Sequence, residues 1–103
     1  MQPLFRALAD PTRREILALL HKGDLTIGQI THHFPMTRAA IKKHLNILED
    51  GDLITTTKQG RERLNRATPA ALAPLRKWIA SFDTLQEDRL AALKRSIAKE
   101  WKT

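Results

Sequence analysis

The sequence contains no cysteine among its 103 residues. This absence excludes disulfide bonds, thiolate metal sites, cysteine nucleophiles and thiol-based redox switches. Long hydrophobic runs are also missing, since no apolar stretch approaches the roughly 18 residues of a membrane span. The first residues do not form the basic segment followed by an apolar segment that a secretory signal requires. We therefore expect a cytoplasmic protein that does not insert into membranes.

Aromatic residues are scarce, with three Phe, two Trp and no Tyr. Trp78 and Trp101 both lie in the last quarter of the chain, so we expect this segment to be part of the folded structure. The composition, 42% hydrophobic and 28% charged, is typical of soluble globular proteins, and the length fits a single domain over residues 1–103.

The charge of the chain is strongly biased, with 18 Lys and Arg against 11 Asp and Glu and a formal net charge of +7. An excess of this kind favours a polyanionic partner, and nucleic acid is the first candidate. The alternative is a basic surface that only confers solubility. The excess is +1 over residues 1–36, +3 over 37–66 and +3 over 67–103, so it is concentrated outside the first third.

The apolar spacing predicts a mainly α fold with a small β-hairpin. Helix caps at Asp10, Thr26 and Thr37 and stop signals at Gly23, Pro35 and Gly51 set most of the boundaries. The expected helices cover 3–9, 11–22, 27–34, 38–50 and about 70–101, and the expected hairpin covers 53–67 with its turn at Gln59-Gly60. This order is that of a winged helix-turn-helix. Residues 1–9 are the predicted dimer-side helix, 10–68 the helix-turn-helix and wing, and 69–103 the C-terminal dimerisation helix.

The predicted helix over 38–50 carries its charges in an unfavourable order. Opposite its buried face, which centres on Ile41, the N-terminal half is basic and the C-terminal half is acidic. The helix dipole prefers the reverse arrangement by about 0.3–1 kcal/mol for each charge. Insertion of this helix into the DNA major groove, N-terminus first, explains the order, because the cations then face phosphates and base edges. The alternative is a solvated basic face.

Individual roles follow from side-chain chemistry. Arg38 is a candidate for a bidentate contact with guanine, and Ala39 is small enough to touch a thymine methyl group. Lys42 and Asn46 are candidates for base edges and Lys43 for phosphate. His44 reaches either a phosphate or the packing between helices. The predicted DNA-binding set is completed by two polar residues at the starts of helices, Gln29 and Thr37.

The predicted hairpin forms a second basic cluster around Gly60, made of Lys58, Arg61, Arg63 and Arg66. Arginine at a hairpin tip suits the minor groove or its flanking phosphates. Because alternate strand residues point to the same face, Arg61 and Arg63 are favoured together with Lys58 as contacts. The alternative is a charged strand edge that prevents aggregation.

The last predicted helix would be about 45–50 Å long, which exceeds the width of the preceding globule. Its apolar stripe therefore needs a covering surface, and a two-fold copy supplies one, with Leu4 and Phe5 of the first helix joining in. Two shorter helices broken near Asp83-Thr84 are the alternative, and Pro74 either starts the helix later or kinks it. The expected interface residues of the last helix are Leu75, Trp78, Phe82, Leu85, Leu90, Leu93, Ile97 and Trp101.

Two stretches of this sequence resemble ArsR-type winged-helix repressors. They are FRALADPTRREILALL at 5–20 and MTRAAIKKHLNILEDGDLI at 36–54, the latter resembling the recognition helix and its exit into the wing. Trp78 and the Leu-rich end are similar to the SdpR-like, metal-independent branch of this family. The resemblance implies a homodimeric bacterial transcriptional repressor that binds an inverted repeat in double-stranded DNA near a promoter, often its own.

The resemblance also indicates where a metal site would lie. Metal-sensing relatives carry cysteines at positions that match Thr26 and Gly28, and others use Asp and His ligands on the last helix. This chain has neither cysteine nor any histidine after His44, and the adjacent His32 and His33 point about 100° apart on a helix. We expect no metal and no other cofactor.

Two other classes of function are open to test. A winged helix can serve as a protein-interaction module whose basic face meets an acidic partner. An enzyme is disfavoured, since the chain has no phosphate-binding glycine loop, carboxylate pair or nucleophile–histidine arrangement. Three modes of release from DNA fit the sequence: a small molecule in the dimer cleft, a protein effector, or autoregulation without an inducer.

Overall fold

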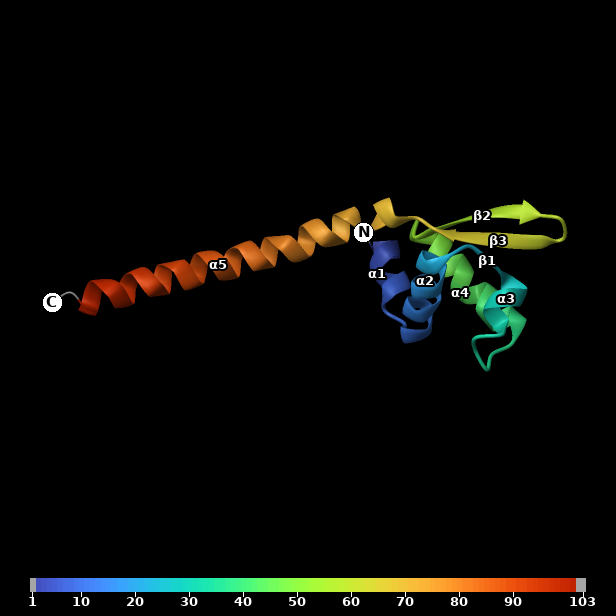
Figure 1. Cartoon of the computed structure of the whole chain (residues 1–103), viewed down its shortest axis with the longest axis horizontal. Coiled ribbons are helices and arrows are strands. Elements are labelled where there is room, and N and C mark those ends of the chain that lie inside the picture. The colour runs from blue at the N-terminus through green and yellow to red at the C-terminus, as the bar shows by residue number, and fades with distance from the viewer. Residues whose placement is uncertain (1, 102–103) are drawn as a thin grey trace. The chain divides into compact units, whose positions relative to one another are not determined.

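Helices and a small antiparallel sheet make up the first part of the chain, and one long helix makes up the rest (Figure 1). The computed structural model describes the backbone of residues 2–101 and the side chains of this range apart from those at positions 84, 85, 100 and 101. The chain divides into two compact units, Met1–Leu72 and Ala73–Thr103.

The helices of the first unit are α1 Gln2–Leu8, α2 Pro11–Lys22, α3 Ile27–Thr31 and α4 Arg38–Asp50. Helices α2, α3 and α4 begin where the predicted caps place them, and α1 begins one residue before its predicted start at Pro3. The Asp10 carboxylate accepts a hydrogen bond of 3.0 Å from the backbone N–H of Arg13, which caps α2. The Thr37 hydroxyl caps α4 in the same way, at 3.1 Å from the backbone nitrogen of Ala40. These side chains satisfy backbone donors that no helical carbonyl can reach.

Helix α3 is shorter than predicted, since it ends at Thr31 and not at Phe34. Beyond Thr31 the backbone makes bonds to the third preceding residue, including one of 2.9 Å from the N–H of His33 to the carbonyl of Ile30. Pro35 disfavours helical geometry at Phe34, so the chain tightens into turns and leaves the helix early.

The predicted hairpin is present and pairs with a third, unpredicted strand. Strands β2 Ile54–Gln59 and β3 Glu62–Ala67 are antiparallel and joined at Gly60, whose φ of +64° is rarely adopted by other residues. Strand β1, Leu25–Thr26, pairs with the other side of β3, so the order is β1-β3-β2. The side-chain amide nitrogen of buried Asn65 donates to the carbonyl of Leu25 at 3.1 Å. Two residues are too few for a strand signal, so pairing with β3 defines β1.

The core of the first unit is aliphatic and lies between the helices and the sheet. The predicted inward face of α4 is confirmed, because Ile41, Leu45 and Leu48 have no exposed surface. Other buried residues of this core come from α1, α2, α3, the start of β2 and the residue before it: Leu4, Ala7, Ile16, Leu17, Leu20, Ile27, Ile30, Leu53 and Ile54.

Gly51 ends α4 as predicted, but its backbone is not in the left-handed conformation that often selects glycine at a helix end. Its φ is −84°, and the residue with positive φ is Asp52, at 60°. A Cβ at position 51 would lie 2.9 Å from the carbonyl oxygen of Pro3 and 3.3 Å from the Cβ of Ala7. Glycine is therefore required because α1 packs directly on the end of α4.

The second unit is a single uninterrupted helix, α5, over Ala73–Trp101. The helix runs without a break, so the alternative of two shorter helices broken near Asp83-Thr84 is wrong. The helix starts three residues later than expected because Pro69–Leu72 form a 3₁₀ turn. Pro74 lies in the first turn, where its missing N–H costs no hydrogen bond. None of the described helices has the combination of length and apolarity that crossing a membrane requires.

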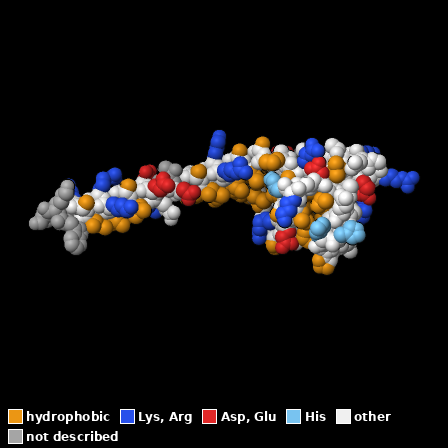
Figure 2. Space-filling model, viewed as in Figure 1, with side chains coloured by type: hydrophobic (Ala, Val, Ile, Leu, Met, Phe, Trp, Pro, Cys, Tyr) orange, Lys and Arg blue, Asp and Glu red, His pale blue; other side chains and the backbone are white. Residues whose placement is uncertain are grey.

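Hydrophobic side chains gather along one edge of α5, and charged side chains occupy much of its remaining surface (Figure 2). The Trp78 and Phe82 rings meet edge to face, with centroids 4.9 Å apart. The side chains of Leu85 and Trp101, which we predicted on the same stripe, lie outside the described residues. The large apolar side chains of the stripe that are between 46% and 56% exposed in the single chain are Trp78, Ile79, Phe82, Leu90, Leu93 and Ile97.

Candidate nucleic-acid interface

Helix α4 presents a polar, mostly basic face on the side opposite its buried leucines and isoleucine. The predicted contact residues on this face are all exposed, as is the cap Thr37. This arrangement follows from the 3.6-residue helical repeat, which separates the apolar and polar positions along α4. The exposed residues are Arg38, Ala39, Lys42, Lys43 and Asn46.

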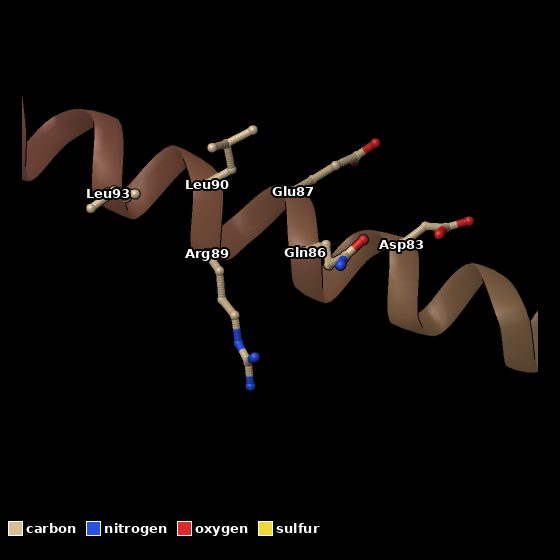
Figure 3. Close-up of a pocket in the computed structure, with 6 residues that line it drawn as sticks. All are labelled: Asp83, Gln86, Glu87, Arg89, Leu90 and Leu93. Carbon is tan, nitrogen blue, oxygen red and sulfur yellow. The ribbon is translucent and has the colours of Figure 1, made fainter.

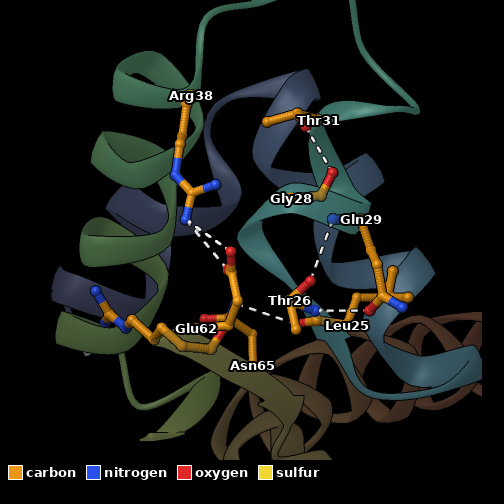
Figure 4. Close-up of polar contacts among 9 residues, drawn as sticks. Leu25, Thr26, Gly28, Gln29, Thr31, Arg38, Glu62 and Asn65 are labelled. Carbon is orange, nitrogen blue, oxygen red and sulfur yellow. Dashed lines mark hydrogen bonds and ion pairs between the residues drawn. The ribbon is translucent and has the colours of Figure 1, made fainter. Parts of the chain in front are cut away.

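Helix α3 precedes α4 in the helix-turn-helix and is fixed by a capping box (Figure 4). The Gln29 side-chain oxygen accepts from the backbone N–H of Thr26 at 2.9 Å, and the Thr26 hydroxyl accepts from the N–H of Gln29 at 3.2 Å. Gln29, which we predicted as a DNA contact, is exposed and has a structural role in addition. Its amide nitrogen still points away from the box and can donate.

Arg38 forms an ion pair with the wing. Its Nη2 lies 3.1 Å from Oε2 and 3.3 Å from Oε1 of Glu62, at the start of β3 (Figure 4). Sequence spacing gave no sign of this contact, since the residues are 24 positions apart. The guanidinium is thus held between α4 and the sheet and is not extended freely into solvent.

Arg63 also turns toward α4. Its Nη2 pairs with the Glu49 carboxylate, and its Nη1 donates to the Asn46 side-chain oxygen at 3.1 Å. The Thr56 hydroxyl donates to the other Glu49 oxygen at 3.4 Å. Two predicted DNA contacts, Asn46 and Arg63, therefore bind each other in the free protein. Glu49 and Thr56 were not predicted as partners.

The expectation that Arg61 and Arg63 share a strand face is wrong. Arg61 belongs to the two-residue turn between β2 and β3, whereas Arg63 lies on β3 directly opposite Lys58. Arg61 is exposed at the tip of the wing, as a contact with a groove requires.

Arg66 anchors the base of the wing. Its Nε and Nη2 lie 2.9 and 2.8 Å from one oxygen of Asp24, in the connection between α2 and β1. These hydrogen bonds raise the pKa of Arg66. The sequence grouped Arg66 with the wing cations, but its role in the free protein is to join the sheet to the end of α2.

The Lys and Arg side chains of α4 and the wing thus fall into two groups, those that are paired with a carboxylate and those that are not. Arg38, Arg63 and Arg66 are each paired with a carboxylate. In the described part of the chain, the remaining cations of α4 and the wing form no ion pair and are exposed, which leaves them available to phosphates. They are Lys42, Lys43, Lys58 and Arg61.

His44 does not belong to this exposed face and lies instead where helices pack together, as one of the two roles predicted for it requires. Its side chain is 18% exposed, and its Nδ1 lies 4.0 Å from an Asp10 oxygen and 3.4 Å from Nη1 of Arg13. Arg13 also donates to the carbonyls of Arg6 and Ala7 at 2.8 and 2.9 Å. The backbone N–H of Arg13 lowers the pKa of Asp10. His44 therefore connects α4 to the junction of α1 and α2.

Several hollows lie on the surface of the described residues. One hollow of about 660 Å³ lies along α5 and is lined by residues of that helix alone, so no second element closes it (Figure 3). Two smaller hollows, of about 360 and 290 Å³, lie between α1 and α4 and between α2 and the segment after α3. Among the described residues, no group of three or more His, Cys, Asp or Glu is placed to hold a metal ion.

The predicted dimer residues of the first unit differ in accessibility. Leu4 is buried at 6% exposure, so little of its surface is left for a partner, whereas Phe5 is half-buried. On α5, Leu75 is also half-buried and the described residues from Trp78 onward are exposed. The apolar surface therefore lies mainly on α5.

Comparison with known proteins identifies the architecture. Residues 10–56 match the family "Bacterial regulatory protein, arsR family". The transcriptional repressor SdpR of Bacillus subtilis (strain 168) is 37% identical over 82 residues, which cover 80% of this chain and 91% of SdpR. An HTH-type transcriptional regulator of Mycobacterium tuberculosis is 35% identical over 80 residues, 78% of this chain and 75% of the relative.

The fold agrees with these similarities. An ArsR-like transcriptional regulator from Rhodococcus sp. RHA1 superposes with a TM-score of 0.80 at 36% identity, covering 96% of this chain and 90% of that one. These relatives are transcriptional regulators and not enzymes. The chain belongs to the ArsR family of bacterial transcriptional regulators, and its winged helix-turn-helix is the DNA-binding fold of that family.

Proposed function

We propose that the protein is a sequence-specific repressor that binds an inverted repeat in double-stranded DNA as a homodimer. The observation that carries this proposal is the exposed face of α4, where Lys42 and Lys43 have no carboxylate partner among the described residues. Unpaired cations beside a small residue, Ala39, form a surface that can approach the floor of a major groove. The similarity to SdpR, which is named a transcriptional repressor, supports repression as the mode of regulation.

In the proposed complex, α4 enters the major groove with its N-terminus leading. Lys42 and Ala39 then face base edges, and Lys43 faces a phosphate. Arg61 at the wing tip, with Lys58 behind it, contacts the flanking minor groove or its phosphates. Asn46 and Arg63 join this set only by exchanging their mutual hydrogen bond for contacts with DNA.

The proposed dimer is formed mainly by α5. At 1.5 Å per residue its 29 residues span about 43 Å, and its apolar stripe remains about half exposed in the single chain. A second copy related by a two-fold axis covers such a stripe with the same residues and closes the assembly. Phe5 of α1 is the residue of the first unit that we assign to the same interface.

Repression in this proposal results from occupancy. Two α4 helices read successive major grooves on one face of the DNA, about 10 base pairs apart, and exclude polymerase from the promoter. The protein then acts in the bacterial cytoplasm, and its own promoter is a natural target. Release by a small molecule, by a protein effector or without an inducer is compatible with this arrangement.

Selection of bound duplexes from a random pool tests the proposal. The expected result is a two-fold symmetric sequence with half-sites about 10 base pairs apart. Affinity for it should fall steeply with salt, because several counterions are released on binding. Absence of duplex binding at low salt overturns the proposal and favours a protein-interaction module that meets an acidic partner. Selection of an asymmetric single site overturns the dimer.

A further inference from the structure

We propose that Glu62 is a positioning residue for DNA recognition, because it holds the Arg38 guanidinium so that one edge is presented to a guanine. This inference rests on the proposed function, in which α4 enters the major groove. Arg38 is the first residue of α4 and Glu62 is the first residue of β3, so the contact joins the recognition helix to the wing.

The hydrogen bonds between Arg38 and Glu62 fix the guanidinium but leave several of its N–H donors free. Both Glu62 oxygens accept from the same nitrogen, Nη2, at 3.1 and 3.3 Å. The Nη1 and Nε groups of Arg38 make no hydrogen bond to the described residues. A guanidinium carries five N–H donors in one rigid plane, so fixing Nη2 orients the plane and leaves the Nη1 edge able to donate. Guanine offers the acceptors O6 and N7 in the major groove, and Nη1 can donate to either of them.

Helix α3 leaves space beside this edge. Gly28 faces the pair, and a Cβ at that position would lie 3.9 Å from Nη1 of Arg38 and 4.0 Å from Oε1 of Glu62. A longer side chain at position 28 would therefore press on the guanidinium and compete with a base. An alanine would fit at these van der Waals distances, so what keeps the Nη1 edge clear is a short side chain at position 28.

Stability of the fold does not explain the pair. The Arg38 and Glu62 side chains are 56% and 40% exposed, and exposed pairs contribute little to folding. An Arg38 without a partner would bind any nearby phosphate, and phosphate contacts carry no sequence information. Glu62 competes with phosphates for Nη2 but leaves the guanine-binding edge open.

The test uses the full-length protein, the selected operator, single-base variants of that operator and an unrelated duplex. Glu62→Gln should tighten binding to the unrelated duplex by about two- to fivefold per protomer and steepen its salt dependence by roughly 0.9 per protomer. It should also reduce the preference for guanine at one operator position by about fivefold. Glu15→Gln, which removes an equal charge from the exposed face of α2, should change neither quantity.

An Arg38→Ala background separates the action of Glu62 through Arg38 from direct repulsion of DNA by its own charge. If Glu62 acts through Arg38, Arg38→Ala loses the same guanine preference and Glu62→Gln adds nothing further in that background. Glu62→Asp, which keeps the carboxylate, should recover part of the preference.

Three results would overturn the role of Glu62. These are an unchanged guanine preference in Glu62→Gln, equal relaxation at all operator positions, and an undiminished effect of Glu62→Gln in the Arg38→Ala background. Each of them leaves the proposed function standing, provided that the wild type selects an operator. Failure of the wild type to select any common sequence overturns both.

Discussion

The side-chain oxygen of Asn46 accepts a hydrogen bond of 3.1 Å from Nη1 of Arg63, which ties the exposed face of α4 to strand β3. The same guanidinium pairs with Glu49, one turn further along α4. The wing and the recognition helix are thereby joined through Asn46 and Arg63, each of which is predicted from the sequence as a DNA contact. Through these contacts the wing helps to hold α4 in its position.

Arg63→Ala should detach the wing from α4. We expect the free energy of unfolding to fall by about 1 kcal/mol, because a half-buried ion pair and a hydrogen bond are lost together. Chemical denaturation measures the loss, and hydrogen exchange should show faster opening of the hairpin. Lys58→Ala is the matched control, since Lys58 lies directly opposite Arg63 in the hairpin and has no ion pair among the described residues. Equal losses in both variants would contradict the role of Arg63.

Lys42→Ala and Lys58→Ala should weaken DNA binding in different ways. Lys42 faces base edges in the proposed complex, so its loss should change sequence preference by about 1–3 kcal/mol at one or two positions. Lys58 faces phosphate, so its loss should weaken all duplexes alike and reduce the salt slope by about 1. Fluorescence anisotropy over a set of duplexes measures both effects. Uniform weakening by both variants would exclude direct readout through Lys42.

Leu93→Glu should weaken the proposed dimer. Leu93 is 56% exposed in the single chain, and burial of such a side chain contributes about 1.5–3 kcal/mol. We expect the dissociation constant of the dimer to rise at least about tenfold, as measured by sedimentation or light scattering over a range of concentrations. Ala91→Glu introduces the same charge about 200° around the helix and should leave the dimer intact. A monomeric wild type would rule out this interface.

Gly51→Ala should destabilise the first unit. The added Cβ would lie 2.9 Å from the carbonyl oxygen of Pro3, so α1 must shift from the end of α4. Overpacking of this kind costs about 1–3 kcal/mol. Gly23→Ala is the control, because nothing lies within 4 Å of a Cβ at that position. Thermal unfolding of the two variants should separate them, and a lower midpoint for Gly23→Ala than for Gly51→Ala would contradict the packing argument.

The Asp10 cap should make stability depend on pH in the acidic range. The backbone N–H of Arg13 lowers the pKa of the Asp10 carboxyl in the folded state. Its contribution is therefore complete above the unfolded pKa, which is about 3.9, and is lost as pH falls through the lower folded value. Denaturation curves from neutral pH downward should show this loss in the wild type.

Two variants of Asp10 distinguish the contribution of its capping hydrogen bond to stability from the contribution of its charge. Asp10→Asn keeps a capping oxygen but does not titrate, so it should remain stable at neutral pH and lose the acid-range dependence that Asp10 supplies. Asp10→Ala should lose the cap at every pH. An unchanged pH profile in Asp10→Asn would show that other carboxyls account for the acid transition.

The local features of this protein could be predicted from its sequence. Caps at Asp10, Thr26 and Thr37 and the apolar spacing of α4 depend on residues within a few positions of one another. The wing turn at Gly60 is local in the same sense. For these features the backbone geometry follows from side chains one or two turns away, and family resemblance pointed to the same fold.

The sequence by itself thus determined the order of the helices and the hairpin and the face of α4 that carries the cations. Only the tertiary structure decided which cations are paired. Arg38 meets Glu62 across 24 residues, and Arg66 meets Asp24 across 42 residues. Strand β1 likewise exists because β3 lies beside it. The sequence shows which side chains are charged and with which sign, but it does not show which of them pair. The pairs are decided by the packing that brings distant segments within hydrogen-bonding distance.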